Sequence, residues 1–301
     1  MTGRPVLALD FGGSKIAVAV AGADGRILGR SVLETKASQG AMQAVDRAVA
    51  EGRRLMLASD ATRPAAVGVS SMGITRDDAV VLAPNVPGWE GLQLPGYLGD
   101  AFGAPVVIWN DVKAAALGEI RWGSLQGASD ALYVNLGTGL AIALVIGGSV
   151  FLGAHGAAGE IGYSLRGLDE GPGVAAGRAP LEEWAAGAGL RRRAASELGQ
   201  ELNADELSRR ADRDPRARGL LEDAAAHTTF HLTNLTIALD PSRIVVGGGL
   251  LRAMPDLMER FRRALDCYVP FPPELRMATF IDDAPLRGAV ALAIDRLPEH
   301  P

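Results

Sequence analysis

A single cysteine, Cys267, is present among the 301 residues of the sequence. One thiol excludes an internal disulfide and a zinc site built from several cysteines, and we expect Cys267 to be a buried small apolar side chain. No apolar run is long enough to cross a bilayer, and no cationic, apolar leader precedes the first apolar stretch. The net charge is -5, so basic residues do not outnumber acidic ones. We therefore expect neither a nucleic-acid nor a membrane partner, and a cytoplasmic location.

Glycine is abundant and aromatic residues are few, with 38 glycines in the chain and 5% aromatic residues. Because the glycines follow no periodic repeat, they indicate tight turns and close backbone approaches rather than disorder. The balance of 48% hydrophobic and 22% charged residues is that of an ordinary globular protein. The length suits one large domain or two medium domains, each with its own core.

A glycine pair lies between two apolar runs in "VLALDFGGSKIAVAV", residues 6–20. The two common phosphate loops run from a strand into a helix, whose N-terminal amides hold the anion. Here the second apolar run is rich in β-branched residues that alternate with alanine, which is typical of a strand. The glycines are therefore predicted to form the tip of a β-hairpin. The stretch is neither a Walker A loop nor a Rossmann fingerprint.

The same pattern recurs in "ALYVNLGTGLAIALVI", residues 131–146. A repeat so far apart in the chain predicts two related domains rather than a solenoid. Strand-like and helix-like segments alternate within each half, so we expect an α/β protein with helices covering mixed sheets. Residues 181–199 and 284–297 are predicted to be helical, and the domain boundary is expected within residues 118–127.

Three further stretches carry a family resemblance: "WNDVKAAALGE" (109–119), "GAHGAAGEIGY" (153–163) and "RIVVGGGL" (243–250). Any one glycine loop alone is weak evidence of family. In this order and at this separation, together with the two glycine hairpins, the stretches resemble ROK-family sugar kinases almost from end to end.

The resemblance implies a two-domain actin-like or hexokinase-like ATPase fold, which is ribonuclease H-like, with a cleft between the domains. It assigns residues 1–118 to the first α/β domain, completed by the C-terminal helix at 285–301. The second, larger α/β domain is expected to span residues 119–284. Family habit also implies a homodimer.

Phosphoryl transfer from ATP needs bound phosphates and a metal ion. Glycine lets the backbone approach an anion closely, so the amides of the two hairpin tips are the expected phosphate cradle. These amides belong to Gly12, Gly13, Ser14, Gly137, Thr138 and Gly139. Asp10 is the expected Mg²⁺ ligand, directly or through water, whereas Lys15 either neutralises phosphate charge or is a solvated hairpin lysine. The resemblance places the adenosine of ATP against Gly247, Gly248 and Gly249.

Asp111 is the predicted general base. A carboxylate at the carboxyl end of a strand, opening a helix, lies where open α/β sheets bind ligands, and partial burial raises its proton affinity. The alternative is a simple helix N-cap, for which aspartate is a favoured residue type. Asn110 beside it, and Asn85 in "APNVPGW", are expected to exchange hydrogen bonds with sugar hydroxyls.

Glu160 and Glu182 match acidic residues that contact sugar hydroxyls in the family. A carboxylate accepts two hydroxyl donors, so such a pocket rejects sugars that lack those hydroxyls. Glu182 has an alternative explanation as a solvated residue in the first turn of a helix, favoured there by the helix dipole. Tyr163 and His155 are further candidates for contact with the sugar, although a structural role explains His155 equally well.

The largest departure from the family lies just after Glu160. Many members carry a histidine there, followed by a short cysteine-rich knuckle, and these residues bind structural zinc. Here Tyr163 stands at the histidine position, and residues 164–180 contain no cysteine. Zinc is therefore not expected, and packing alone must hold this segment. His227 and His231 have a metal-binding spacing on a predicted helix, but without a third ligand we expect them to be packing residues.

The resemblance implies ATP-dependent phosphorylation of a hexose hydroxyl, with glucose as acceptor and Mg²⁺ as the metal. Alternatives within the fold are a kinase for N-acetylhexosamine, fructose or mannose, a kinase that uses polyphosphate, and a catalytically silent sugar-binding sensor. The family also contains sugar-responsive repressors with an N-terminal helix-turn-helix domain. We expect no such domain here, because the first phosphate-loop strand begins within a few residues of Met1, and the acidic balance disfavours DNA.

Overall fold

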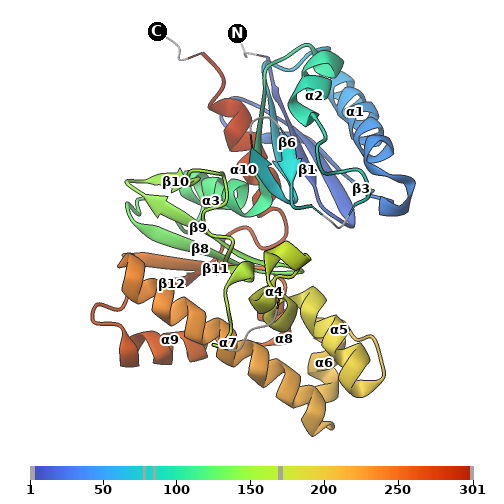
Figure 1. Cartoon of the computed structure of the whole chain (residues 1–301). Helices are drawn as coiled ribbons and strands as arrows, with labels where there is room; N and C mark the ends of the chain where they lie inside the picture. The colour runs from blue at the N-terminus through green and yellow to red at the C-terminus, as the bar shows by residue number, and fades with distance from the viewer. Residues whose placement is uncertain (1–3, 77–78, 84–85, 169–171, 299–301) are drawn as a thin grey trace. The chain divides into compact units, whose positions relative to one another are not determined.

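The computed structural model describes residues 4–76, 79–83, 86–168 and 172–298. Internal contacts divide the chain into two units. Figure 1 shows the chain coloured by residue number from the N-terminus to the C-terminus. Unit 1 comprises Met1–Gln126, Leu152–Ala157 and Asp283–Pro301, and unit 2 comprises Gly127–Phe151 and Ala158–Asp282. Among the described residues, none of the helices combines the length and hydrophobicity that spanning a bilayer requires.

Unit 1 contains a five-stranded sheet in the order β3-β2-β1-β4-β7 and a separate hairpin, β5-β6. Its strands are β1 (Val6–Phe11), β2 (Lys15–Ala21), β3 (Ile27–Glu34), β4 (Val67–Ser71), β5 (Ile74–Arg76), β6 (Ala79–Val81) and β7 (Val106–Asn110). Its helices are η1 (Ala37–Gln39), α1 (Ala41–Ala58), α2 (Leu94–Phe102), α3 (Asp111–Trp122) and α10 (Ala284–Ile294).

Unit 2 contains a second five-stranded sheet, in the order β10-β9-β8-β11-β12. Its strands are β8 (Ala131–Leu136), β9 (Leu140–Ile146), β10 (Ser149–Phe151), β11 (Arg243–Gly247) and β12 (Glu274–Met277). Its helices are η2 (Ile161–Tyr163), η3 (Val174–Ala176), α4 (Pro180–Ala185), α5 (Gly187–Leu198), α6 (Ala204–Ala211), α7 (Pro215–Leu239), α8 (Leu250–Ala253) and α9 (Leu257–Tyr268).

The two sheets have the same topology. In each, the first strand of the unit (β1 or β8) pairs antiparallel with the next strand through a short hairpin. The third strand continues antiparallel, and two parallel strands extend the other side of the sheet. The two copies of the glycine hairpin therefore join equivalent strands, β1 to β2 in one sheet and β8 to β9 in the other.

The sheet of unit 1 is covered on both faces, and the alternation along β1 and β2 decides which helix covers which face. Large side chains such as Leu7 and Leu9 pack into the cluster with α1 and α2. The intervening small residues, Ala8 and Ala19 among them, pack into the cluster with α10. The alternation with alanine therefore gives one face room for bulky side chains and lets α10 approach the other face closely.

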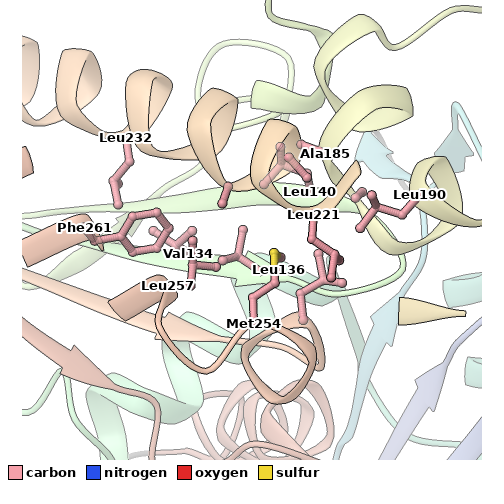
Figure 2. Packing of buried hydrophobic residues seen from close by; sticks show 14 of the residues in the cluster. Val134, Leu136, Leu140, Ala185, Leu190, Leu221, Leu232, Met254, Leu257 and Phe261 are labelled. Carbon is pink, nitrogen blue, oxygen red and sulfur yellow. The ribbon is translucent and has the colours of Figure 1, made fainter. Parts of the chain in front are cut away.

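The core of unit 2 lies between its sheet and its helices, as Figure 2 shows. Leu136 of β8 and Leu140 of β9 meet Leu221 of α7, Leu190 of α5 and Phe261 of α9 in one buried cluster. Strand side chains on one face and helix side chains at three- to four-residue spacing bury the same apolar volume. This packing fixes β8 and β9, and hence the hairpin between them.

Cys267 is exposed, so the prediction of a buried cysteine is wrong. It lies on α9, whose buried residues Leu257, Phe261 and Leu265 recur every fourth position. Cys267 falls off that stripe because it lies two residues beyond the last of them, on the opposite side of a helix with 3.6 residues per turn.

Helices α3 and α10 of unit 1 approach each other at Gly288 and Gly118. A Cβ atom on Gly288 would collide with the carbonyl group of Ala114, and one on Gly118 would lie 3.0 Å from the Gly288 nitrogen. The neighbouring atoms are helix backbone, which cannot rotate away as a flexible side chain does. The close approach therefore depends on glycine at these positions.

Replacing Gly288 by alanine is expected to destabilise the protein by about 2–4 kcal/mol, because the new methyl group must displace helix backbone. Gly96→Ala is the matched control. Gly96 is exposed within α2 and its Cβ would meet nothing within 4 Å, so alanine should stabilise by up to about 1 kcal/mol. Urea unfolding of both variants measures the difference, and equal midpoints would contradict the close approach.

Candidate functional site

The first turn, residues 12–14, joins β1 to β2 in unit 1. The Gly12 amide donates to the Lys15 carbonyl at 3.0 Å and closes the hairpin. Thr35 holds the turn from outside, since its hydroxyl donates to the Gly12 carbonyl at 2.7 Å and its amide donates to the Ser14 carbonyl at 3.0 Å. The exposed amides of Gly13 and Ser14 donate to no acceptor within the described residues. Adjacent unpaired amides of this kind are suited to bind an anion.

The second turn, residues 137–139, joins β8 to β9 in unit 2. Its first amide, that of Gly137, donates to the Gly139 carbonyl at 3.1 Å. The amides of Gly187 and Ala188 donate to the carbonyls of Gly137 and Thr138 at 2.9 and 3.0 Å. In the described part of the chain, the amides of Thr138 and Gly139 have no acceptor. The second turn therefore presents two open amides, as the first turn does.

The prediction of one continuous helix over 181–199 is wrong, because the structure breaks it into α4 and α5. Ala186 between them has extended backbone angles, φ -83° and ψ 164°. The break starts a new helix at Gly187, and its first amides, which a continuous helix would have used internally, bond the second turn instead. The sequence of this stretch is compatible with helix throughout, so the tertiary hydrogen bonds decide the break.

Asp10 lies at the end of β1, next to the first turn, and is partly buried. The Ser70 hydroxyl donates to Asp10 Oδ1 at 2.8 Å. Burial raises the pKa of Asp10 from 3.8 to about 6, against the opposing effects of the Ser70 hydrogen bond and the charges of Lys15 and Arg30. Asp10 is therefore a carboxylate short of counter-charge, which is the environment that favours a bound cation.

Asp111 is the first residue of α3, directly after β7, and is partly buried. Burial and, to a smaller extent, the nearby charge of Asp10 raise its pKa from 3.8 to about 6, against the opposing effects of the Val112 amide and Lys113. The helix N-cap is Asn110, whose buried side chain accepts from the Lys113 amide at 2.9 Å. The alternative of Asp111 as a simple N-cap is therefore wrong, because Asn110 fills that role.

Glu160, Tyr163 and Glu182 come together in unit 2. Glu160 precedes the short helix η2 and Tyr163 is its last residue. The Ile142 amide donates to the Gly159 carbonyl at 2.9 Å and ties this segment to β9. A Cβ on Gly162, within η2, would lie 3.0 Å from Glu182 Cβ. The Glu182 carboxylate itself accepts from the Leu140 amide at 2.9 Å. Glu182 therefore has a specific partner rather than being only a solvated helix-turn residue.

The remaining predicted site residues lie in separate places. His155 is exposed, in the Leu152–Ala157 segment of unit 1. Asn85 lies outside the described residues. Gly247 ends β11, and Gly248 has φ +101° with its Cα against the backbone of Leu136, the residue before the second turn. Gly247, Gly248 and Gly249 therefore lie beside the second turn within unit 2.

Sequence analysis missed Thr35 and gave no assignment to Ser70, although each fixes a predicted site element. Thr35 is 1% exposed and Ser70 is fully buried, and both are polar residues inside apolar surroundings. Buried hydroxyls are normally hydrogen-bonded, but the chain alone does not show to what, because their partners lie 23 and 60 residues away. The pairing of β2 with β3 brings Thr35 to the first turn, and the pairing of β1 with β4 brings Ser70 to Asp10.

The cysteine-free segment after Tyr163 is held by more than packing. The guanidinium groups of Arg166 and Arg193 stack on the Trp184 ring, 4.0 and 3.8 Å from its centroid. Arg178 forms an ion pair with Glu183 through three hydrogen bonds. Since Arg166 and Arg178 belong to the segment while Trp184 and Glu183 belong to α4, these contacts fasten it to the helix that carries Glu182.

Within the described residues, no group of three or more histidine, cysteine, aspartate or glutamate side chains is arranged to hold a metal ion. His227 contacts Trp184 edge to face, with ring centroids 6.1 Å apart. His231 is partly buried, which lowers its pKa, and it contacts Phe230. Both histidines lie on α7 and make ring contacts, His227 with a residue of α4 and His231 with its neighbour on α7.

Replacing Asp111 by asparagine is expected to stabilise the metal-free protein at about pH 8. A carboxyl group whose pKa is higher in the folded than in the unfolded chain destabilises the folded state at any pH above its folded-state pKa. This cost disappears when the pH falls below the unfolded-state pKa, which is near 4. The gain should be about 1–3 kcal/mol at pH 8 and should shrink toward zero by about pH 4. Urea unfolding in the presence of EDTA at several pH values measures it.

The matched control is Asp205→Asn, because Asp205 is an exposed aspartate in the first turn of α6. Its replacement should give no gain that depends on pH in this way. A gain for Asp111→Asn that is the same at every pH would show that burial of the carboxylate is not its cause.

Trp184→Leu is expected to destabilise the protein by about 1–3 kcal/mol, because both guanidinium groups lose the ring face. Trp184→Phe keeps a weaker ring face. It also removes an indole N–H that is buried without a hydrogen-bond partner among the described residues, so it should cost less than about 1 kcal/mol. Urea midpoints of the two variants test this, and equal losses would mean that ring volume rather than stacking matters.

Comparison with known proteins gives the family. A model of the ROK family matches residues 6–296. N-acetylmannosamine kinase of Shigella flexneri is 30% identical over 297 residues, covering 96% of this chain and 98% of that protein. A ROK hexokinase structure from Thermus thermophilus is 33% identical, with a TM-score of 0.80 and coverage of 96% and 97%. A ROK family glucokinase from Streptomyces griseus, in complex with glucose and AMPPNP, is 29% identical with a TM-score of 0.78 and coverage of 97% and 99%.

These similarities confirm the predicted α/β fold of the actin-like and hexokinase-like ATPases, with the same five-stranded sheet built once in each unit. The relatives and this chain match over nearly their whole lengths, so the resemblance does not rest on one shared segment. The family match reaches from the first strand to the residues after the last helix. The chain therefore belongs to the ROK family.

Proposed function

We propose that this ROK-family sugar kinase transfers the γ-phosphoryl group of ATP to a hydroxyl of a hexose, with glucose as the acceptor and Asp111 as the general base. The observation that carries the proposal is the environment of Asp111. It opens α3 at the carboxyl end of β7, partly buried, with its pKa raised to about 6. A base with a pKa near the working pH accepts a proton from a hydroxyl more effectively than an ordinary aspartate.

The donor side of the proposed site consists of the open amides. Gly13 and Ser14 in the first turn, with Thr138 and Gly139 in the second, each offer an N–H that the protein does not use itself. Such amides stabilise phosphate oxygens without the reorganisation that flexible side chains require. Lys15 adds a positive charge beside the first turn.

Asp10 would hold Mg²⁺, directly or through water, which fits a hard oxygen ligand whose pKa is raised by burial. A bound Mg²⁺ would neutralise part of the negative charge of the phosphates. Ser70 fixes the orientation of the Asp10 carboxylate by its hydrogen bond to Oδ1. The glycines at 247–249, beside the second turn, would leave room for the adenosine.

On the acceptor side, the proposed sugar-binding residues of unit 1 are Asp111 and Asn110. Those of unit 2 are Glu160, Glu182 and Tyr163. Carboxylates that accept hydroxyl donors select polyhydroxylated ligands. Contacts of His155 and Asn85 with the sugar are predicted from the sequence alone. The same holds for a homodimer and a cytoplasmic location.

The named relatives differ in their sugar: one is an N-acetylmannosamine kinase and another a glucokinase. A panel of glucose, mannose, fructose, N-acetylmannosamine and N-acetylglucosamine, each with ATP or polyphosphate, separates these alternatives. Glucose with ATP should give the highest kcat/KM. A higher value for an N-acetylhexosamine would replace glucose in the proposal and leave the reaction class intact.

Asp111→Asn is expected to lower kcat by about 10²–10⁴-fold, since it removes the proton acceptor. Glucose affinity should stay within about threefold, because the amide keeps hydrogen-bonding capacity at that position. Coupled kinetics and calorimetric titration measure the two quantities. Asp205→Asn, the exposed helix-turn aspartate, serves as control and should leave both unchanged.

The competing function is a catalytically silent sugar sensor. In that case the unaltered chain would bind a sugar of the panel but phosphorylate none of them, and Asp111→Asn would change little. That pair of results would overturn the proposed function.

A further inference from the structure

We propose that Glu182 is a positioning residue for the second turn, so that one carboxylate serves both the sugar and the nucleotide. The identity of the two ligands rests on the proposed function. The geometry of the carboxylate and the turn does not, because both lie within unit 2.

The contact between Glu182 and the turn is direct. Glu182 Oε2 accepts from the amide of Leu140 at 2.9 Å, and Leu140 is the residue that follows the second turn and begins β9. A hydrogen bond from a backbone amide to a carboxylate is charge-assisted and stronger than one between neutral groups. The carboxylate thereby fixes the end of the turn at the point where it enters the sheet.

Two glycines make room for this carboxylate. A Cβ on Gly139 would lie 2.7 Å from Glu182 Oε2. A Cβ on Gly162 would lie 3.0 Å from Glu182 Cβ and 3.4 Å from Oε2. The side chain of Glu182 is therefore enclosed between the second turn and the η2 segment that carries Glu160 and Tyr163.

The turn is fastened at three points by one short stretch of chain. Besides the Glu182 carboxylate, the amides of Gly187 and Ala188 hold the carbonyls of Gly137 and Thr138. These three hydrogen bonds hold the turn in place, and the amides of Thr138 and Gly139 form none of them. Loss of the carboxylate removes the anchor on the β9 side and leaves the two anchors on the other.

The second oxygen of Glu182 is the link to the sugar. Oε1 makes no hydrogen bond or ion pair with any described residue, and the residue is partly exposed. A sugar hydroxyl that donates to Oε1 would orient the same carboxylate whose Oε2 holds the turn. Sugar and nucleotide affinities are then coupled through one side chain, and such coupling is reciprocal.

The experiment measures AMPPNP with Mg²⁺ by calorimetric titration without any sugar. Glu182→Ala should weaken binding by about 5- to 50-fold, the effect of losing one charge-assisted hydrogen bond at the turn. Glu182→Gln keeps an oxygen that accepts from Leu140, so nucleotide affinity should stay within about threefold while the KM for the sugar rises. This split separates a positioning role from a general loss of structure.

Glu201→Ala is the matched control, because Glu201 is an exposed glutamate of unit 2 that follows α5. Its replacement should change AMPPNP affinity by no more than about threefold. A loss for Glu201→Ala equal to that for Glu182→Ala would overturn the specific role of Glu182.

Glu182→Asp provides a second variant in case the alanine protein does not fold. It keeps the charge but withdraws the carboxylate by one methylene, so it should also weaken AMPPNP binding. Unchanged AMPPNP affinity in Glu182→Ala, or in Glu182→Asp where that variant replaces it, overturns the inference and leaves the proposed function standing. Absence of AMPPNP binding in the unaltered chain would overturn both together.

Discussion

Two backbone amides in each glycine turn are kept open, and the surrounding structure is arranged to keep them so. Backbone N–H groups in folded proteins almost always find a partner. Here the amides of Gly13, Ser14, Thr138 and Gly139 have none within the described residues, while the first amide of each turn closes the hairpin. An exposed turn with unused donors keeps its shape only if its carbonyls are held from elsewhere. This requirement explains why each turn is surrounded by hydroxyl or amide groups that donate to its carbonyls.

The two units have sheets of the same topology, but different residues hold the turn carbonyls in each. In unit 1 a single residue, Thr35, holds two carbonyls of the first turn, one through its hydroxyl and one through its amide. In unit 2 the chain breaks a helix at Ala186, and the free amides at the start of α5 hold the second turn. Since the sheets have one topology, the differences lie in the segments that follow them. The architecture is duplicated, but the anchoring of the turns is not.

Local patterns predicted the elements and the acids, but not what anchors them. Alternation and glycine pairs are properties of neighbouring residues, so the two hairpins and the position of Asp111 at a strand end follow from the sequence. Thr35, the Ser70 bond to Asp10 and the break at Ala186 depend on partners far along the chain. Cys267 was assigned to the core from residue type alone, whereas the stripe of α9 decides its exposure. Tertiary contacts decide the first three of these cases, and the apolar stripe within one helix decides the last.

The arginine stack on Trp184 has a consequence for Glu182. A segment that a metal ion holds is coupled to metal supply and to the redox state of its thiols. Cation–π and ion-pair contacts depend on neither, but they weaken with exposure and, for the ion pair, with salt. Trp184 and Glu183 follow Glu182 directly on α4, so whatever loosens Arg166 or Arg178 also loosens the helix that carries the carboxylate. The geometry of the second turn is thus tied, through one short helix, to Arg166 and Arg178.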